Sequence, residues 1–350
     1  MLKSFRYLFL PISVLYGGII WLRNTLYNKK IFTSATFNFP IICVGNLAVG
    51  GTGKTPMVEL LLRMLQQHYK VATISRGYKR KTKGFGIANK NTTALEIGDE
   101  PMQFHQKFAN ITVAVGEERL VAIPQLLQEK PATEVIILDD AFQHRSVQAG
   151  INILLTEYKN LYCHDFMMPA GDLRDIKASA TRAEVIIVTK CKNDISIEEK
   201  NKIVKQLKPQ VHQTILFAAL NYDMPSHLFN NNTVQLNNTV DVLLVCGIAN
   251  PKPLKDYLTS TVRSFDMLRY PDHHIFDSDD LIEIKKHFQK LKSENKLIIT
   301  TEKDGVRLQK FENELANFPL YVLPIQHQFL FEGYTTLENK VINFINLYKK

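Results

Sequence analysis

One glycine-rich run, residues 48–55, constrains the fold of this chain more than any other part of its sequence. The run reads Ala-Val-Gly-Gly-Thr-Gly-Lys-Thr; it follows the apolar stretch Pro40 to Val44 and precedes a helical pattern. Because glycines lack a Cβ, successive backbone N–H groups in such a loop approach phosphate oxygens closely. A strand, a glycine-rich loop and a helix in this order predict a P-loop-type parallel α/β fold that binds a nucleoside triphosphate.

The residues of this run have distinct predicted roles. Lys54 supplies a mobile positive charge for the β and γ phosphates, and Thr55 offers a hydroxyl to Mg²⁺. The motif departs from its usual form at the first position, where Ala48 replaces glycine. The predicted nucleotide-binding residues are Ala48, Val49, Gly50, Gly51, Thr52, Gly53, Lys54 and Thr55. The buried face expected for the following helix consists of Val58, Leu61, Leu62 and Leu65.

Composition narrows the class of partner. The chain has 350 residues, 45% of them hydrophobic and 22% charged, which suits a globular protein of about two domains. Its formal net charge of +9 indicates an anionic partner: a nucleic acid, a membrane surface or a phosphorylated substrate. We expect no nucleic-acid partner, because stacking aromatics within a basic groove are not evident. The four cysteines form no C-x-x-C pair, so we expect buried thiols rather than disulfides or a zinc site.

The N-terminus carries an uncharged, mostly apolar segment, Tyr7 to Leu22, between Arg6 and Arg23. It is interrupted by one proline and two glycines, and it is shorter than the roughly 20 apolar residues of a bilayer crossing. Basic flanks and aromatic residues near its ends favour a helix that lies in the interface of an anionic leaflet. The alternative is a core helix that packs on the domain.

Val/Ile-rich runs recur after the glycine loop and alternate with helical stretches, which indicates a parallel sheet covered on both faces. The predicted strands of this first series cover residues 71–75, 111–115, 134–138, 151–155 and 184–189. A second series covers residues 240–246, 296–301 and 320–324. The Asn-rich stretch 221–238 reads as a linker or a long hairpin. We therefore expect an N-terminal membrane-associated helix (1–30), a P-loop core (31–220) and a second, smaller α/β lobe (221–350).

The strand predicted at residues 134–138 is followed by two carboxylates, Asp139 and Asp140. Ligands bind at the carboxyl ends of strands in such sheets, and P-loop enzymes hold Mg²⁺ or its waters with acids at this place. We predict that Thr55, Asp139 and Asp140 form the metal side of the site. A plain turn or a helix cap is the alternative.

Three further motifs place charge in turns. Asp99 and Glu100 precede a proline that opens a helix, so they either cap that helix or take part in catalysis. The run Tyr270-Pro-Asp-His-His274 is a base or a capped turn, since it lacks the helical spacing of zinc motifs. The role of the loop Thr300 to Asp304 cannot be derived from spacing.

Together these motifs resemble those of the tetraacyldisaccharide 4′-kinase family of lipid A biosynthesis. The matching runs occur in family order from about residue 1 to about residue 325. They are Val44–Pro56, Ser75-Arg-Gly-Tyr78, Gly98-Asp-Glu-Pro101, Val115-Gly with Arg119, Leu138-Asp-Asp-Ala-Phe-Gln-His144, Met168-Pro-Ala-Gly with Leu173-Arg174, Gly247-Ile-Ala-Asn-Pro251, Pro271-Asp-His273 and Thr301-Glu-Lys-Asp304.

The resemblance implies a membrane-associated kinase that uses ATP and Mg²⁺ to phosphorylate the 4′-hydroxyl of a glucosamine disaccharide 1-phosphate carrying four acyl chains. It implies a P-loop NTPase-like fold with a second α/β lobe and an N-terminal membrane-binding helix. The expected partners are the acylated disaccharide lipid and an anionic membrane surface. The expected location is the cytoplasmic face of the inner membrane of a Gram-negative-type bacterium, as a peripheral or monotopic protein.

The resemblance also implies roles for single residues. Asp99 matches the family's catalytic acid, and the histidine of the Asp-His run, here His273, assists it alongside Lys54. The duplicated histidine leaves open whether His273 or His274 acts. The residues expected to contact the nucleotide or the disaccharide phosphate are Glu100, Arg76, Arg119, Gln143, His144 and Arg174. The competing hypothesis is a P-loop nucleotide-switch or assembly ATPase. It requires a base-specific Asn-Lys-x-Asp loop, and the only candidate, Thr189-Lys-Cys-Lys192, lacks the Asp at its fourth position.

Overall fold

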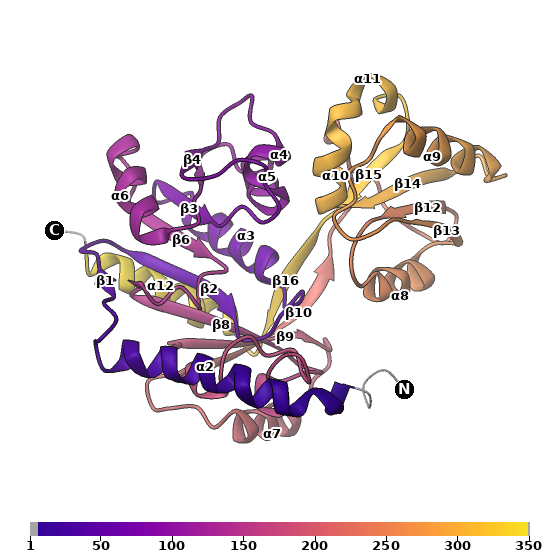
Figure 1. Cartoon of the computed structure of the whole chain (residues 1–350). Helices are drawn as coiled ribbons and strands as arrows, with labels where there is room; N and C mark the ends of the chain where they lie inside the picture. The colour runs from indigo at the N-terminus through magenta and orange to yellow at the C-terminus, as the bar shows by residue number, and fades with distance from the viewer. Residues whose placement is uncertain (1–5, 349–350) are drawn as a thin grey trace. The chain divides into compact units, whose positions relative to one another are not determined.

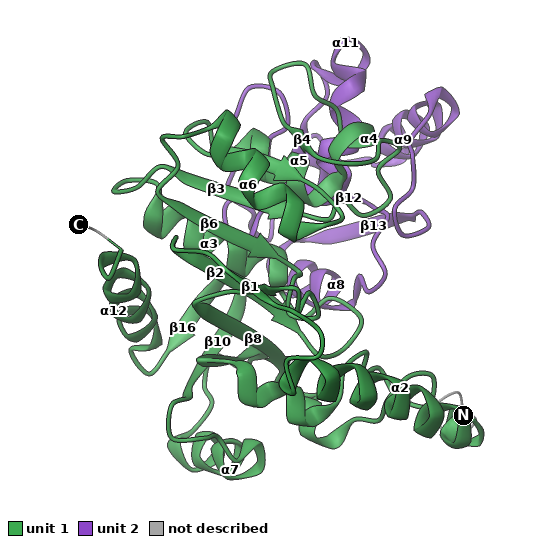
Figure 2. Cartoon of the chain, turned by 60° about the vertical axis from the view of Figure 1, so that its left-hand side comes forward, with its two compact units in different colours: residues 1–221, 326–350 green, residues 222–325 purple. Residues whose placement is uncertain are grey.

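Two sheets built mainly from parallel strands organise the chain in the computed structural model, which describes residues 6–348 (Figure 1). The chain forms two compact units (Figure 2). Unit 1 comprises residues 1–221 and 326–350, and unit 2 comprises Tyr222–Ile325. Unit 1 therefore contains the glycine-rich loop, and unit 2 contains the Asp-His-His run.

The unit 1 sheet has nine strands in the order β16-β10-β9-β8-β2-β6-β3-β5-β4. Neighbours from β10 through β5 pair in parallel, and β4 pairs antiparallel at one edge. The strands are β2 (Ile41–Asn46), β3 (Val71–Ser75), β4 (Gly86–Ile87), β5 (Thr112–Val115), β6 (Val135–Asp139), β8 (Ile151–Glu157), β9 (Val185–Cys191), β10 (Thr214–Tyr222) and β16 (Ile325–Leu330). A separate parallel pair joins β1 (Ala35–Thr36) to β7 (Val147–Gln148).

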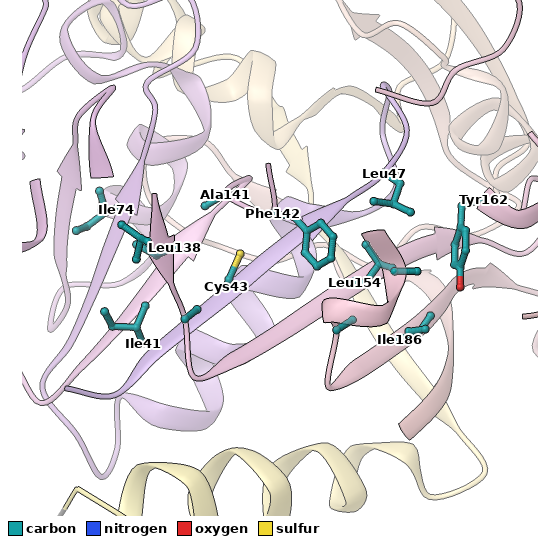
Figure 3. Packing of buried hydrophobic residues seen from close by; sticks show 14 of the residues in the cluster. Ile41, Cys43, Leu47, Ile74, Leu138, Ala141, Phe142, Leu154, Tyr162 and Ile186 are labelled. Carbon is teal, nitrogen blue, oxygen red and sulfur yellow. The ribbon is translucent and has the colours of Figure 1, made fainter. Parts of the chain in front are cut away.

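Helices cover both faces of this sheet. They are η1 (Tyr7–Phe9), α2 (Leu10–Asn28), α3 (Lys54–Leu65), α4 (Ala94–Ile97), α5 (Asp99–Lys107), α6 (Arg119–Glu129), η2 (Tyr162–His164), η3 (Lys177–Arg182), α7 (Ile197–Leu207) and α12 (Gly333–Asn346). Successive residues of a strand point to opposite faces, so Ile41 and Cys43 join a core with α6 and α7 (Figure 3). Ile42 and Val44 join the other core, with α3, α5 and α12. The predicted apolar face of α3 is fully buried in this second core.

The unit 2 sheet has five strands in the order β11-β15-β14-β12-β13. All its neighbours pair in parallel except β11, which is antiparallel to β15. The strands are β11 (Ser226–His227), β12 (Asp241–Cys246), β13 (Ser264–Arg269), β14 (Lys296–Thr301) and β15 (Leu320–Leu323). The helices are α8 (Lys252–Thr261), α9 (Ser278–Lys290), α10 (Glu302–Leu308), η4 (Gln309–Phe311) and α11 (Glu312–Leu315). Because β13, β12 and β14 are parallel neighbours, their carboxyl ends and the loops that follow lie at one edge.

The predicted α/β fold class, with a P-loop sheet and a smaller α/β lobe, is confirmed, and the predicted strands appear at closely similar bounds. The expected lobe from 221 to 350 differs from unit 2 at its C-terminal end. After β15 the chain returns to unit 1, where β16 joins the sheet beside β10. Leu337, Val341 and Ile345 of α12 are buried there, and this burial of apolar surface holds the returning segment. All four cysteines are free thiols; Cys43, Cys191 and Cys246 are buried, as expected, whereas Cys163 is half-buried.

The N-terminal helix α2 buries polar side chains and exposes apolar ones. Ser13 accepts a hydrogen bond from the backbone of Ala170, and Asn24 donates one to Asp175. The exposed apolar side chains of this segment are Tyr7, Leu8, Phe9, Ile12, Val14, Leu15, Ile19, Trp21 and Leu22. Within residues 6–348, one helical stretch, Tyr7–Asn28, has the length and composition to cross a membrane. The core-helix alternative is wrong, because most apolar side chains of the segment lie outside any core.

Candidate functional site

The glycine-rich loop connects the carboxyl end of β2 to the first residue of α3, as the sequence predicts. Gly50 and Gly53 have φ angles of +103° and +88°, a region that L side chains rarely adopt. The carbonyl of Thr52 accepts a hydrogen bond from Thr189 Oγ1 at 2.8 Å, and its hydroxyl accepts one from Asn46 Nδ2 at 2.9 Å. Thr189 of β9 and Asn46 of β2 therefore fix the conformation of the loop. The N-terminus of α3, which follows the loop, is the kind of helix end that binds anions.

A cluster of charged side chains lies beside this loop. Lys54 Nζ is 3.7 Å from Asp140 Oδ1 and 3.4 Å from Asn46 Oδ1. Arg174 pairs with both carboxylate oxygens of Asp140 and donates to Asn46 Oδ1 at 2.6 Å. Burial alone would raise the pKa of Asp140, but Lys54 and Arg174 outweigh it and hold that pKa below its usual range. The predicted phosphate residues Lys54 and Arg174 and the predicted metal residue Asp140 thus lie together.

Asp139 lies at the end of β6, opposite Val44 of β2 in the sheet register. Its carboxylate is buried and accepts a hydrogen bond from Ser75 Oγ at 3.2 Å. Burial raises the pKa of Asp139 to about 7, and the negative charges of Glu100 and Asp140 add to this effect. Within residues 6–348, no three His, Cys, Asp or Glu side chains are grouped to hold a metal by themselves. Two carboxylates and a hydroxyl fit Mg²⁺, which takes its remaining ligands from water and phosphate oxygens.

Asp99 and Glu100 begin α5 in unit 1. Gly98, just before them, has a φ of +93°, and a Cβ there would lie 3.1 Å from the carbonyl oxygen of Tyr78. The other end of α5 is tied to α3 through Glu59, a fully buried carboxylate. Glu59 accepts a hydrogen bond from Gln103 at 2.8 Å and pairs with Lys107 at 2.6 Å. These bonds fix the helix that carries Asp99 to the helix that carries Lys54.

The other predicted contact residues of unit 1 differ in their exposure to solvent. Arg76 is exposed just after β3, whereas Arg119 is fully buried and donates to the carbonyls of Gly116, Glu117 and Asp139. This geometry supports the end of β6 and keeps the Arg119 guanidinium away from solvent. Gln143 Nε2 donates to the carbonyl of Asn46 at 2.8 Å. Burial, with the charge of Arg119, lowers the pKa of His144 to about 4, so its ring is neutral near pH 7.

Two polar residues at this edge were missed by sequence reasoning. Asn46 bonds Lys54, Arg174, Thr52 and Gln143, and its signal is a polar side chain at the end of an otherwise apolar strand. His327 of β16 is buried, and its Nε2 donates to the carbonyl of Gly53 at 2.9 Å. Burial lowers the pKa of His327 to about 4. No local sequence pattern predicts this contact, because the two residues are far apart in the sequence.

In unit 2 the two histidines of the Asp-His-His run have different surroundings. His273 has a φ of +65°, and its backbone N–H donates to the carbonyl of Gly247 at 3.3 Å. His274 stacks on Tyr270 with ring centroids 4.7 Å apart and bonds Asp280 of α9 at 2.7 Å. Both nitrogen-bearing rings are thus engaged, His274 in packing and at the start of α9 and His273 with Arg307 through Nδ1 at 2.9 Å. We take His273, the histidine that directly follows the Asp of the run, as the candidate for chemistry.

The chain resembles proteins of known description over nearly its whole length. Residues 5–345 match the family model described as tetraacyldisaccharide-1-P 4′-kinase. A protein named tetraacyldisaccharide 4′-kinase from Bacteroides thetaiotaomicron is 41% identical, over 98% of this chain and 94% of its own length. One of the same name from Flavobacterium johnsoniae is 44% identical over 93% of each chain. A crystal structure of LpxK from Aquifex aeolicus in complex with ATP superposes with a TM-score of 0.75 and 28% identity, covering 99% of both chains.

Proposed function

The chain belongs to the tetraacyldisaccharide-1-P 4′-kinase family, and from this premise we propose how its own residues carry out phosphoryl transfer. It is an ATP- and Mg²⁺-dependent kinase of bacterial lipid A biosynthesis that phosphorylates the 4′-hydroxyl of a tetraacylated glucosamine disaccharide 1-phosphate. The nucleotide-switch alternative is not favoured. The observation that carries the assignment of the site is the meeting of Lys54, Asp140 and Arg174 beside the glycine-rich loop.

We propose that residues 48–55 hold the triphosphate of ATP. The backbone N–H groups of the loop and the α3 N-terminus face the phosphates, and Lys54 neutralises the oxygens of the transferred group. In such transfers most of the rate comes from electrostatic stabilisation of charge on the phosphoryl oxygens. Lys54 would then exchange its contact with Asp140 for the nucleotide.

In this proposal Thr55, Asp139 and Asp140 would hold Mg²⁺. A bound Mg²⁺ would supply positive charge that neutralises the phosphates during transfer. The high pKa of Asp139 reflects carboxylates crowded into a buried edge, which is the arrangement that a divalent cation relieves. Glu100 contributes to that crowding and is proposed to act on the same side of the site.

We propose that Asp99 accepts the proton of the 4′-hydroxyl and that His273 orients or tunes it. Asp99 opens a helix of unit 1 that is anchored to α3, and His273 lies in a loop at the carboxyl edge of the unit 2 sheet. Their cooperation is a prediction that kinetics can test. Arg76, Gln143, His144 and Arg174 are proposed to contact the nucleotide or the disaccharide phosphate, and Arg119 to act through the carbonyls that it holds.

We propose further that α2 rests in an anionic membrane surface on the cytoplasmic face of the inner membrane, with the two sheets outside the lipid. What supports this is the inverted polarity of the helix, whose polar side contacts unit 1. Arg6 donates to Asp172 at 2.8 Å, and Arg23 donates to the carbonyl of Gln143 at 3.0 Å. The exposed apolar side then faces the leaflet in which the substrate's acyl chains lie.

Replacing Val14, Leu15 and Ile19 together by Ser tests the membrane proposal. Binding to vesicles of phosphatidylethanolamine and phosphatidylglycerol should be lost in sedimentation, whereas the free energy of unfolding should change little, because these side chains are 66–71% exposed. The matched control replaces three other exposed apolar residues, Ile197, Val211 and Ile282, by Ser. Equal sedimentation of both variants would contradict the proposal.

The kinase assignment itself is tested by ATP turnover with and without the acylated disaccharide 1-phosphate. A kinase transfers the γ-phosphate of ATP to the disaccharide, so a 4′-phosphorylated lipid accumulates in step with ADP. A nucleotide switch hydrolyses ATP to inorganic phosphate whether or not the lipid is present. The second result would overturn the proposed transfer to the lipid hydroxyl and the roles of Asp99 and His273 in it, while the ATP site would stand.

A further inference from the structure

The run Thr301-Glu-Lys-Asp304, whose role spacing could not give, ends β14 and forms the first turn of α10 rather than a loop. It meets the His273 turn at one edge of the unit 2 sheet, where the segments after β12, β13 and β14 converge. A Cβ on Gly247 would lie 2.9 Å from the carbonyl oxygen of Pro271 and 3.1 Å from Asp304 Oδ1, so the three segments pack without room for a side chain at that point. His273 is held at this junction in a left-handed conformation that few residues other than glycine adopt.

Arg307 of α10 bonds the His273 ring. Its Nη2 lies 2.9 Å from His273 Nδ1. A guanidinium has donors and no acceptor, so this Nδ1 must present its lone pair. The ring proton of a neutral His273 is therefore on Nε2, and Nε2 becomes the nitrogen that donates to another group.

Arg307 is itself fixed from two sides. Its Nη1 donates to the carbonyl of His274 at 3.3 Å and lies 3.5 Å from Asp304 Oδ1. Asp304 Oδ2 accepts hydrogen bonds from the backbone of Gly247 at 2.9 Å and from Thr301 Oγ1 at 2.7 Å. The Asp304 side chain is 0% exposed and that of Arg307 is 7% exposed. This chain of contacts runs from the end of β12 to the imidazole.

We propose that Asp304 and Arg307 are positioning residues that hold His273 in the tautomer with its proton on Nε2. This inference rests on the proposed catalytic role of His273, which it deepens. The capping of α10 explains Thr301, whose hydroxyl accepts from the Asp304 backbone at 3.2 Å. Capping does not explain why Arg307 reaches across to the His273 ring.

The first test reads the tautomer directly in the full chain. Ring ¹⁵N chemical shifts of labelled histidine, assigned by comparison with His273→Gln, should show an unprotonated Nδ1 and a protonated Nε2 in the wild-type protein. A proton on Nδ1 in the wild type would overturn the proposal, and this result needs no variant of Arg307 to fold. In Arg307→Ala the two nitrogens should move toward averaged values.

The second test uses transfer kinetics. Arg307→Ala should lower kcat by roughly tenfold to a hundredfold, the range seen when a hydrogen-bond partner that orients a metal-bound histidine is removed, and leave the KM for ATP unchanged. In a His273→Ala background the same change should cost nothing further. A further loss in that background would show that Arg307 acts on its own and would overturn the positioning role. If His273→Ala alone left kcat unchanged, the catalytic role of His273 would fail, while the tautomer measurement would still decide this inference.

Arg263→Ala is the matched control. Arg263 makes a two-point ion pair with Asp241, at 2.8 and 2.6 Å. This pair lies at the amino-terminal end of β12 and β13, whereas His273 follows their carboxyl ends. Loss of this pair should leave both the His273 shifts and kcat at wild-type values. Arg307→Lys keeps the charge and is the variant to use if Arg307→Ala does not fold; it should show a smaller tautomer change than any neutral replacement, and identical shifts in all variants would contradict the proposal.

Discussion

Two clusters of charged side chains, one at the carboxyl edge of each sheet, are buried to different degrees. In unit 1, the side chains of Lys54, Arg174 and Asp140 are 18%, 24% and 36% exposed. In unit 2, Asp304 and Arg307 are almost fully buried. Partly exposed charges can exchange their mutual contacts for a ligand, whereas buried pairs are costly to separate. The first edge is thus suited to bind phosphate, and the second to hold one histidine.

Lys54→Ala should produce the largest effect on the transfer rate, and it tests whether the unit 1 cluster binds phosphate. Because the partner proposed for Lys54 is the ligand, phosphate transfer should fall by a factor on the order of a thousand, with little change in stability. Radiolabelled ATP and the acylated disaccharide measure the rate, and Lys340→Ala on α12 controls for loss of a lysine. Wild-type turnover in a folded Lys54→Ala protein would refute the ATP site.

Asp304→Ala should produce the largest stability effect. It leaves Arg307 buried without its carboxylate, which costs about 3–5 kcal/mol in the free energy of unfolding of unit 2. Denaturant unfolding followed in unit 2 measures this loss. A change below about 1 kcal/mol would show that the unit 2 cluster is as adaptable as the unit 1 cluster, and the comparison would break.

The buried His327, which bonds the Gly53 carbonyl of the glycine-rich loop, should make stability depend on pH. Its folded-state pKa of about 4 lies below the unfolded value of about 6.5, so the unfolded chain binds more protons between these pH values. The contribution of His327 is therefore unchanged above about pH 6.5, and stability falls by up to about 3 kcal/mol as the pH drops toward 4. His327→Gln keeps a donor for the Gly53 carbonyl and should flatten this pH dependence. An unchanged slope would contradict the burial argument.

Asp140→Asn should have the smallest effect on stability, within about 1 kcal/mol, because its partly exposed ion pairs contribute little. The same change should still abolish most transfer, because it removes one of the proposed Mg²⁺ ligands. Thermal unfolding and rate measurements on one preparation separate the two effects. A large loss of stability would place Asp140 in the same class as Asp304.

The parts of the fold that could be predicted from sequence are mainly strands whose two faces are both buried. Strands such as β2 and β6 are buried on both faces, so they read as continuous apolar runs. Strand β13 was missed because it is partly exposed at the sheet edge, so its sequence Ser-Phe-Asp-Met-Leu-Arg has no continuous apolar run. The return of β16 and α12 to unit 1 was missed because it depends on pairing between distant segments.

The candidate site divides in the same way. The positions of Lys54, Asp139 and Asp140 were predictable because each belongs to a local motif, the glycine-rich loop that opens a helix or the carboxyl end of an apolar strand. The contact of His327 with Gly53 and the chain from Asp304 through Arg307 to His273 have no local signal, because each joins separate segments. Spacing alone could not separate His273 from His274, and the packing of His274 on Tyr270 is a long-range feature that supports the choice of His273.

We predict that Asp99 of unit 1 and His273 of unit 2 act together in one reaction. A double-mutant cycle in single-turnover transfer tests this claim most directly, with ATP affinity measured in each variant. Groups that act as a unit give non-additive losses, so Asp99→Ala combined with His273→Ala should be little slower than the worse single variant. ATP should bind equally in all three. Losses that multiply fully in the double variant would contradict the account.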